Sequence, residues 1–176
     1  MARRNLRFYG DPVLRLKAAP VAGFDPSLGD LVRDMFDTCE AEEGAGLAAP
    51  QIGVSLRVFV VDCREDPEDP ASRAHRFAAV NPTILRIEGQ ISAEEGCLSI
   101  PGLRETVKRH ARVTLAAFDL DGKPFEVEAG GLAARAVQHE MDHIDGILFI
   151  DRLSSLKRQL LKRQLDSIAA GEQAVS

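Results

Sequence analysis

Residues 138–143 of the chain read Gln138-His139-Glu140-Met141-Asp142-His143. His139 and His143 are four residues apart, so on a helix both imidazoles lie on one face and can bind the same metal ion. Glu140, next to the first histidine, lies within reach of a water molecule on that metal. Helical spacing continues around these residues from about 131 to 145. The stretch therefore predicts a metal-binding helix that also carries an acid–base glutamate.

A third protein ligand is needed, because a catalytic metal usually has three protein ligands and a water molecule. The sequence has no histidine after His143, and the acidic candidates there are Asp145, Asp151, Asp166 and Glu172. Before the helix, a cysteine lies within the stretch Glu94-Glu95-Gly96-Cys97-Leu98-Ser99. This polar setting is not typical of a core thiol. Cys97 therefore joins the acids as a candidate ligand.

Two further helices flank the central part of the chain. Residues 26–43 have apolar side chains at helical spacing, namely Leu28, Leu31, Val32, Met35, Phe36 and Cys39. Residues 154–170 are predicted to be a C-terminal helix with one apolar face, formed by Leu156, Leu160, Leu161, Leu165 and Ile168. Both helices are expected to lay these faces on a core.

Several short strands are predicted between the first helix and the metal-binding helix. β-Branched and aromatic runs indicate strands at about 56–61, 77–80, 83–87 and 97–100. Asp121-Gly122 divides two alternating runs within 113–127, which indicates a hairpin. Residues 62–76 are polar and contain two prolines, so they are expected to form a surface loop in which His75 is solvated.

The order of these elements predicts the fold class. One helix, several strands and then two helices do not alternate as parallel α/β units do. The prediction is an α+β fold with mainly antiparallel β-sheets packed around the central metal-binding helix, and with a C-terminal helix. The 176 residues are expected to form a single catalytic domain, 1–176.

Composition narrows the class of function. The formal net charge of −5 argues against a protein that binds nucleic acid as a whole, and no DNA partner is expected. No apolar run reaches the roughly 20 residues that a membrane span needs, so no membrane partner is expected. The basic N-terminus leads into no apolar segment of a signal peptide. The odd count of three cysteines fits a reducing cytoplasm.

Three motifs together resemble the signature motifs of the peptide deformylases. They are the His-Glu-x-x-His helix, the stretch Glu95-Gly96-Cys97-Leu98-Ser99, and the stretch Gly44-Ala45-Gly46-Leu47-Ala48-Ala49-Pro50-Gln51. Their order and spacing are those of the family, and the similarity extends from about Tyr9 to about Leu153. The resemblance implies an enzyme that removes the formyl group from N-formylmethionyl nascent peptides, releasing formate.

The resemblance also implies the metal site. Its ligands would be Cys97, His139 and His143, with water in the fourth position. The native metal would be Fe(II), and Zn, Ni or Co could substitute for it. A thiolate with two imidazoles suits several of these metals, so the residues by themselves leave the choice open.

By the same resemblance, Glu140 would be the general acid–base residue when water attacks the formyl carbonyl. The Leu98 backbone N–H and the Gln51 side-chain amide would stabilise the oxyanion. The expected substrate-binding residues are Gly44, Ala45, Gly46, Gly96 and Arg104. Family members commonly have Ile or Val in place of Ala45, which leaves the depth of the methionine pocket open. Arg109 is a candidate ion-pair partner of Glu95.

The sequence leaves two rival functions and one further partner open. One rival is a His-Glu-x-x-His endopeptidase, and the other is a homologue that keeps its metal but only binds N-termini or ribosomes. A deformylase would act in the cytoplasm of a bacterium, or in an organelle of bacterial descent. The last helix carries four basic residues against Asp166, which motivates the hypothesis that it docks on ribosomal RNA; they are Lys157, Arg158, Lys162 and Arg163.

Overall fold

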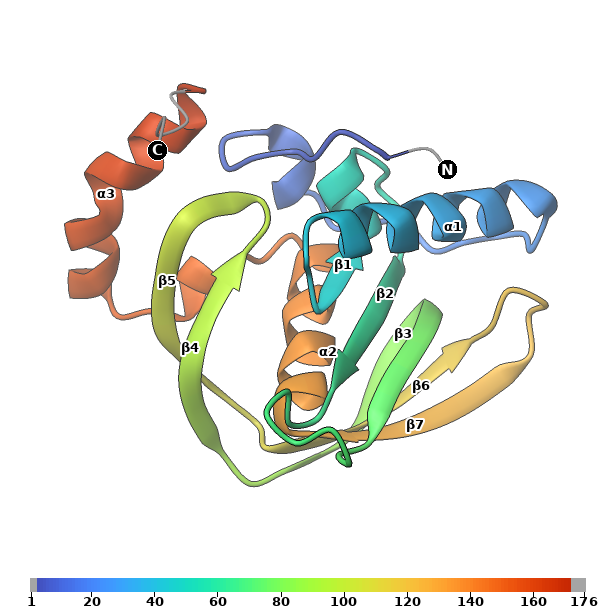
Figure 1. Ribbon diagram of the computed structural model, residues 1–176. Helices are drawn as coiled ribbons and strands as arrows, with labels where there is room; N and C mark the ends of the chain where they lie inside the picture. The colour runs from blue at the N-terminus through green and yellow to red at the C-terminus, as the bar shows by residue number, and fades with distance from the viewer. Residues whose placement is uncertain (1–2, 172–176) are drawn as a thin grey trace.

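The computed structural model describes residues 3–171. In this range the strands pair antiparallel in a larger and a smaller sheet (Figure 1). The larger sheet has the order β1-β2-β3-β6-β7, with strands at Gly46–Ala48, Val58–Arg64, Ala74–Glu88, Arg112–Phe118 and Pro124–Gly130. The smaller sheet is the hairpin of β4 and β5, at Ile91–Cys97 and Ile100–Arg109. The α-helices are α1, α2 and α3, at Pro26–Ala41, Gly131–Ile144 and Ser155–Ala169.

Strand β2 shows why the sheet has a helix on each face. Successive side chains of a strand point to opposite faces. Val58 and Val60 pack with α1 residues such as Met35, whereas Phe59 and Val61 pack in the cluster that contains the α2 core. Because both faces are covered, β2 reads as a continuous apolar run rather than an alternating one.

Helix α2 lies at the centre of the molecule, between the larger sheet and the β4–β5 hairpin (Figure 1). Small residues on its sheet-facing side, Ala133, Ala134 and Val137, are fully buried against the strands. Across the helix, the hairpin packs with the turn η3 (Phe149–Arg152) and with α3 in a separate apolar cluster. This arrangement confirms the predicted α+β fold with antiparallel sheets around the central helix.

The hairpin prediction at Asp121-Gly122 is confirmed, because β6 and β7 pair on either side of this turn and Gly122 has a φ of 76°. The two strands expected at 77–80 and 83–87 form one long strand, β3. Asn81 has a φ of 49°, and register shifts near it let the strand continue past Pro82. A local irregularity of this kind bends a strand without ending it.

Three other predictions need correction. The segment expected as a strand at about 97–100 is instead the turn of a hairpin, because β4 ends at Cys97 and β5 begins at Ile100. The polar loop is shorter than 62–76, because β2 extends to Arg64 and β3 begins at Ala74. His75 is therefore a strand residue, and it is 4% exposed rather than solvated. On α3, Leu156 and Leu160 are 65% and 75% exposed. The helix projects from one end of the molecule, so only its other side, with Leu161, Leu165 and Ile168, reaches the hairpin cluster.

Candidate metal centre

Three ligand atoms converge where the end of β4 meets α2. Cys97 Sγ lies 3.3 Å from His143 Nε2, and the Nε2 atoms of His143 and His139 are 3.2 Å apart. The three ligand atoms all lie within 4.8 Å of one another. Tetrahedral ligands at metal distances of about 2.0–2.3 Å would be roughly 3.3–3.6 Å apart. The spacing of these residues therefore fits a single metal ion.

The protonation chemistry of the two histidines also suits a cation between them. Burial, together with neighbouring His139, lowers the pKa of His143, so this imidazole stays neutral and able to ligate. Burial alone would lower the pKa of His139 as well, but hydrogen bonds with Cys97 and Glu95 raise it well above its ordinary value. Sulfur and carboxylate acceptors thus surround the His139 ring, a setting that also suits a cation.

A buried ion-pair network orients His139, one of the three candidate ligands. Glu95 accepts a hydrogen bond from His139 Nδ1 at 3.1 Å, which leaves Nε2 directed at the site. Arg109 donates two hydrogen bonds to Glu95 and one to Asp142, with side-chain exposures of 3%, 6% and 9% for the three residues. Burial raises the pKa of Glu95, but the hydrogen bonds from Arg109 and His139 outweigh it and lower this pKa to about 2. The predicted pairing of Arg109 with Glu95 is confirmed.

Glu140 faces the site from the same helix. It is 3% exposed, and its Oε2 has no hydrogen-bond partner among residues 3–171. Burial raises its pKa to about 7. A Cβ atom at Gly46 would lie 2.9 Å from Glu140 Oε1, so only glycine lets β1 approach this carboxylate so closely. The free carboxylate oxygen with a pKa near neutrality has the properties of a general base or acid.

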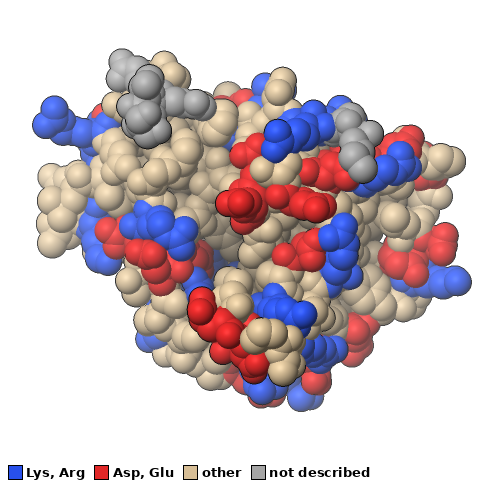
Figure 2. All heavy atoms as spheres, viewed as in Figure 1, with Lys and Arg blue, Asp and Glu red and all other residues tan. Residues whose placement is uncertain are grey.

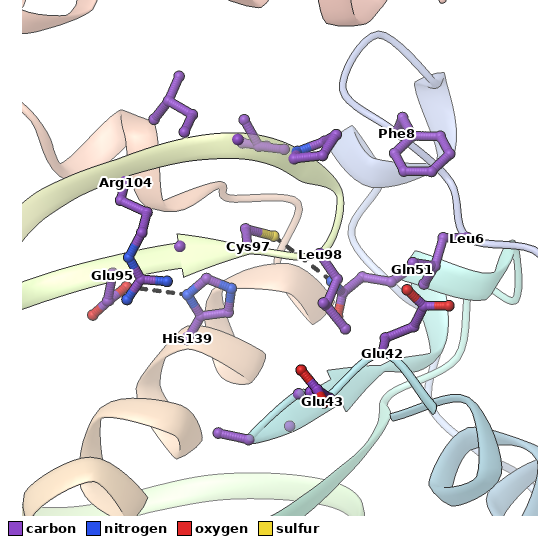
Figure 3. Close-up of a pocket in the computed structure, with 18 of the residues that line it drawn as sticks. Leu6, Phe8, Glu42, Glu43, Gln51, Glu95, Cys97, Leu98, Arg104 and His139 are labelled. Atoms are coloured by element: carbon purple, nitrogen blue, oxygen red, sulfur yellow. Dashed lines mark hydrogen bonds and ion pairs between the residues drawn. The ribbon is translucent and has the colours of Figure 1, made fainter. Parts of the chain in front are cut away.

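Gln51 is oriented by hydrogen bonds at both ends of its amide. Its Oε1 accepts from the Ala48 N–H at 2.8 Å, so its Nε2 is directed to Ser99 Oγ at 3.2 Å and lies 3.7 Å from Cys97 Sγ. Figure 3 shows Gln51 reaching towards Cys97, with Leu98 and His139 around the same space. A donor fixed in this way is suited to stabilising an oxyanion. Ser99 belongs to the cysteine motif, but nothing in the local sequence indicates that it is a partner of Gln51.

A groove of about 1550 Å³ opens onto these residues. Small-molecule pockets typically have volumes of about 300–1,000 Å³, so this groove has room for several residues of an extended peptide. The predicted substrate-binding residues all line it: Gly44, Ala45, Gly46, Gly96 and Arg104. Arg104 lies at the exposed rim and pairs with Glu94 at 2.9 Å. The structure thus brings the predicted site residues together, while their roles stay predictions.

The opposite rim of the groove is acidic. Glu42 and Glu43 directly follow α1 and line the groove, and Figure 2 shows acidic side chains gathered over this end of the helix. Glu43 has a φ of 54°, in the left-handed region that glycine usually occupies at a helix end. The N–H groups of Glu43 and Gly44 bond back to the carbonyls of Glu40 and Cys39, which closes the helix in the usual C-terminal motif.

Comparison with known proteins gives a consistent family assignment. The family model described as polypeptide deformylase matches residues 4–159. A protein from Acidobacterium capsulatum named peptide deformylase is 46% identical over 98% of this chain and 99% of its own length. A peptide deformylase structure from Legionella pneumophila is 45% identical, with a TM-score of 0.86, and the match covers 99% of this chain and all of that one. A Met-Ala-Ser-bound peptide deformylase structure from Acinetobacter baumannii is 36% identical, with a TM-score of 0.80 and coverage of 86% and 99%.

The match with the family model spans nearly the whole chain and includes all three motifs and every predicted site residue. The relatives are similar over their full lengths as well as in sequence and fold. On these grounds the chain belongs to the polypeptide deformylase family.

Proposed function

We propose that this chain removes the N-terminal formyl group from N-formylmethionyl peptides, acting as one catalytic domain with the site residues described above. The observation that carries the proposal is the convergence of Cys97, His139 and His143 beside Glu140, at a peptide-sized groove. Within residues 3–171, Oε2 of Glu140 has no hydrogen-bond partner. The peptide Met-Ala-Ser, bound in the Acinetobacter baumannii relative, is the kind of product that this reaction leaves. The products would be formate and a peptide with a free N-terminal methionine.

Fe(II) is the metal that we propose for this site, with Zn, Ni and Co able to replace it. One thiolate and two imidazoles form a donor set that accepts all four ions. When bound, the metal supplies Lewis-acid chemistry, lowering the pKa of water from 15.7 towards about 7. Cys97 and the two histidines would hold it, and Glu95 would keep the His139 ring in the orientation that ligation requires.

The chain's own residues would divide the remaining work. Glu140 would take the proton from the attacking water and deliver it to the departing amine nitrogen. The Gln51 amide and the Leu98 backbone N–H would donate hydrogen bonds to the oxyanion that develops on the formyl carbonyl. Backbone at Gly44, Ala45 and Gly46 would pair with the extended peptide by strand addition, since β1 is an edge strand of the sheet.

The test is formate release from a formyl-Met-Ala-Ser peptide by protein purified without oxygen and loaded with iron or nickel. We expect release by the loaded protein, loss of release after chelation, and recovery when metal is added back. Acetyl-Met-Ala-Ser serves as the matched substrate control and should be hydrolysed far more slowly. Cleavage of internal peptide bonds in N-blocked peptides, without formate, would instead support an endopeptidase.

We also propose that the enzyme meets its substrate at the ribosome, in the bacterial cytoplasm, through the basic residues of α3. Arg158 and Arg163 are exposed there, whereas Lys157 pairs with Glu105 and Lys162 with Asp166. Replacing Arg158 and Arg163 by glutamine is expected to abolish salt-sensitive co-sedimentation with ribosomes. The matched control replaces Arg33 and Arg112, which are exposed elsewhere. Co-sedimentation that persists in the α3 variant would refute this docking surface.

Within residues 3–171, no helix is both long and apolar enough to cross a membrane.

A further inference from the structure

The N-terminus of α2 lacks a cap of its own. The N-cap residue is Gly130, no side-chain hydrogen bond caps it locally, and the first turn contains no acidic residue. The first N–H groups of a helix need acceptors from outside the helix, and a negative charge there is favourable. Because α2 carries both histidines and Glu140, the way in which this end is held bears directly on the site.

Glu65, from the loop between β2 and β3, supplies the missing acceptors. Its Oε1 accepts from the Gly130 N–H at 3.1 Å, and its backbone carbonyl accepts from the Leu132 N–H at 2.7 Å. Gly131 has a φ of 51°, and a Cβ there would lie 2.1 Å from the Glu65 carbonyl oxygen. Only glycine allows so close an approach. The β2–β3 loop at Glu65 and the start of α2 therefore pack in close backbone contact.

His75 holds the carboxylate of Glu65 in place. Its Nε2 lies 3.0 Å from Glu65 Oε1, and because a carboxylate only accepts, this nitrogen carries the proton. The His75 side chain is 2% exposed, and its ring packs edge-on against Phe77. The hydrogen bonds from His75 and from the Gly130 N–H keep the pKa of Glu65 below its ordinary value, so the carboxylate is charged at neutral pH.

The two segments joined by Glu65 both line the substrate groove. Pro67, two residues further along the loop, lines it, and so do Leu132, Arg135 and Ala136 from the first turns of α2. The metal-facing end of the helix is held separately, by the bonds of Asp142 to Arg109 and Arg152. Glu65 therefore supplies the polar contacts of the first turn of α2, and the buried network supplies those of the ligand-bearing turns.

We infer that Glu65 and His75 are positioning residues that hold the substrate-binding half of α2, and that they set peptide affinity without taking part in the chemical step. The inference rests on the proposed function in naming a formyl peptide as the substrate. In Glu65→Ala, KM for formyl-Met-Ala-Ser is expected to rise about five-fold with kcat nearly unchanged. The absorption spectrum of the cobalt-loaded variant should match that of the wild type, because the metal ligands are held elsewhere.

Matched variants separate positioning from general destabilisation. Both donors reach the same oxygen, Oε1, so Glu65→Gln can keep both hydrogen bonds and should restore most of the affinity. His75→Phe replaces the imidazole by another aromatic ring and removes the N–H donor to Glu65. It should raise KM by less than Glu65→Ala does. In the double variant, KM should be no higher than in Glu65→Ala alone, because the two residues act through one contact. Glu68→Ala alters an exposed acid of the same loop and should leave KM unchanged.

Amide hydrogen exchange tests the contact without relying on activity. Exchange at the Gly130 and Leu132 amides should become faster in Glu65→Ala, while exchange in the last turns of α2 stays slow. An unchanged KM, or a fall in kcat together with an altered cobalt spectrum, would overturn the inference. If the wild type released no formate, the proposed function would fail. The exchange data would then decide on their own whether Glu65 holds the helix.

Discussion

Replacing Glu140 by glutamine is expected to lower kcat for formyl-Met-Ala-Ser about a thousand-fold while the bound metal is retained, in line with the usual effect of losing a general acid–base residue. Glutamine has nearly the same shape as glutamate but cannot accept the proton from water. The Glu140 side chain is buried and is not one of the three converging ligands, so metal content should stay at the wild-type level. Steady-state kinetics and elemental analysis on the same sample measure both quantities.

Glu128→Gln, an exposed acid on β7, is the matched control and should retain full activity. The pH dependence of the wild type gives a second check. Burial raises the pKa of Glu140 to about 7, and the charge of a bound metal will lower it from there. The rate should therefore fall on the acidic side of neutrality as the base becomes protonated. Substantial turnover by Glu140→Gln would remove Glu140 from the mechanism.

Replacing Arg109 by leucine is expected to destabilise the protein by about 3–5 kcal/mol, because it leaves buried carboxylates without their partner. Arg109 is 3% exposed in its side chain and bonds to both Glu95 and Asp142. Urea unfolding of the metal-free protein measures the change. Arg104→Leu on the same strand breaks an exposed pair with Glu94 and should cost less than about 1 kcal/mol. If the two substitutions lowered the free energy of unfolding equally, the buried network would not be the source of the stabilisation.

The same network predicts how stability depends on pH. Glu95 has a pKa of about 2 in the folded protein, below its ordinary value of 4.5. A lowered carboxyl pKa stabilises the fold above the ordinary value, and that contribution is lost as pH falls from 4.5 towards 2. The free energy of unfolding of the wild type should therefore decrease over this window more steeply than that of Glu95→Gln.

The sequence by itself determined the chemical core of this protein. Histidines four residues apart share a helix face because of helical geometry alone, so His139 and His143 could be placed together without a structure. The cysteine and glutamine motifs then identified the family and the remaining candidate residues. The antiparallel hairpin at Asp121-Gly122 could also be predicted from the local sequence, since its turn residues favour it. These features depend on residues near one another in the chain.

Only the tertiary structure decided how that core is held. Asp142 could be assigned as a partner of Arg109, and Ser99 as a partner of Gln51, only once distant segments had been brought into contact. His75 was expected in solvent because its neighbours are polar, yet it is buried beside Glu65 at the start of α2. A polar residue can be buried wherever a distant segment supplies its hydrogen bond, and local sequence pattern carries no record of that partner.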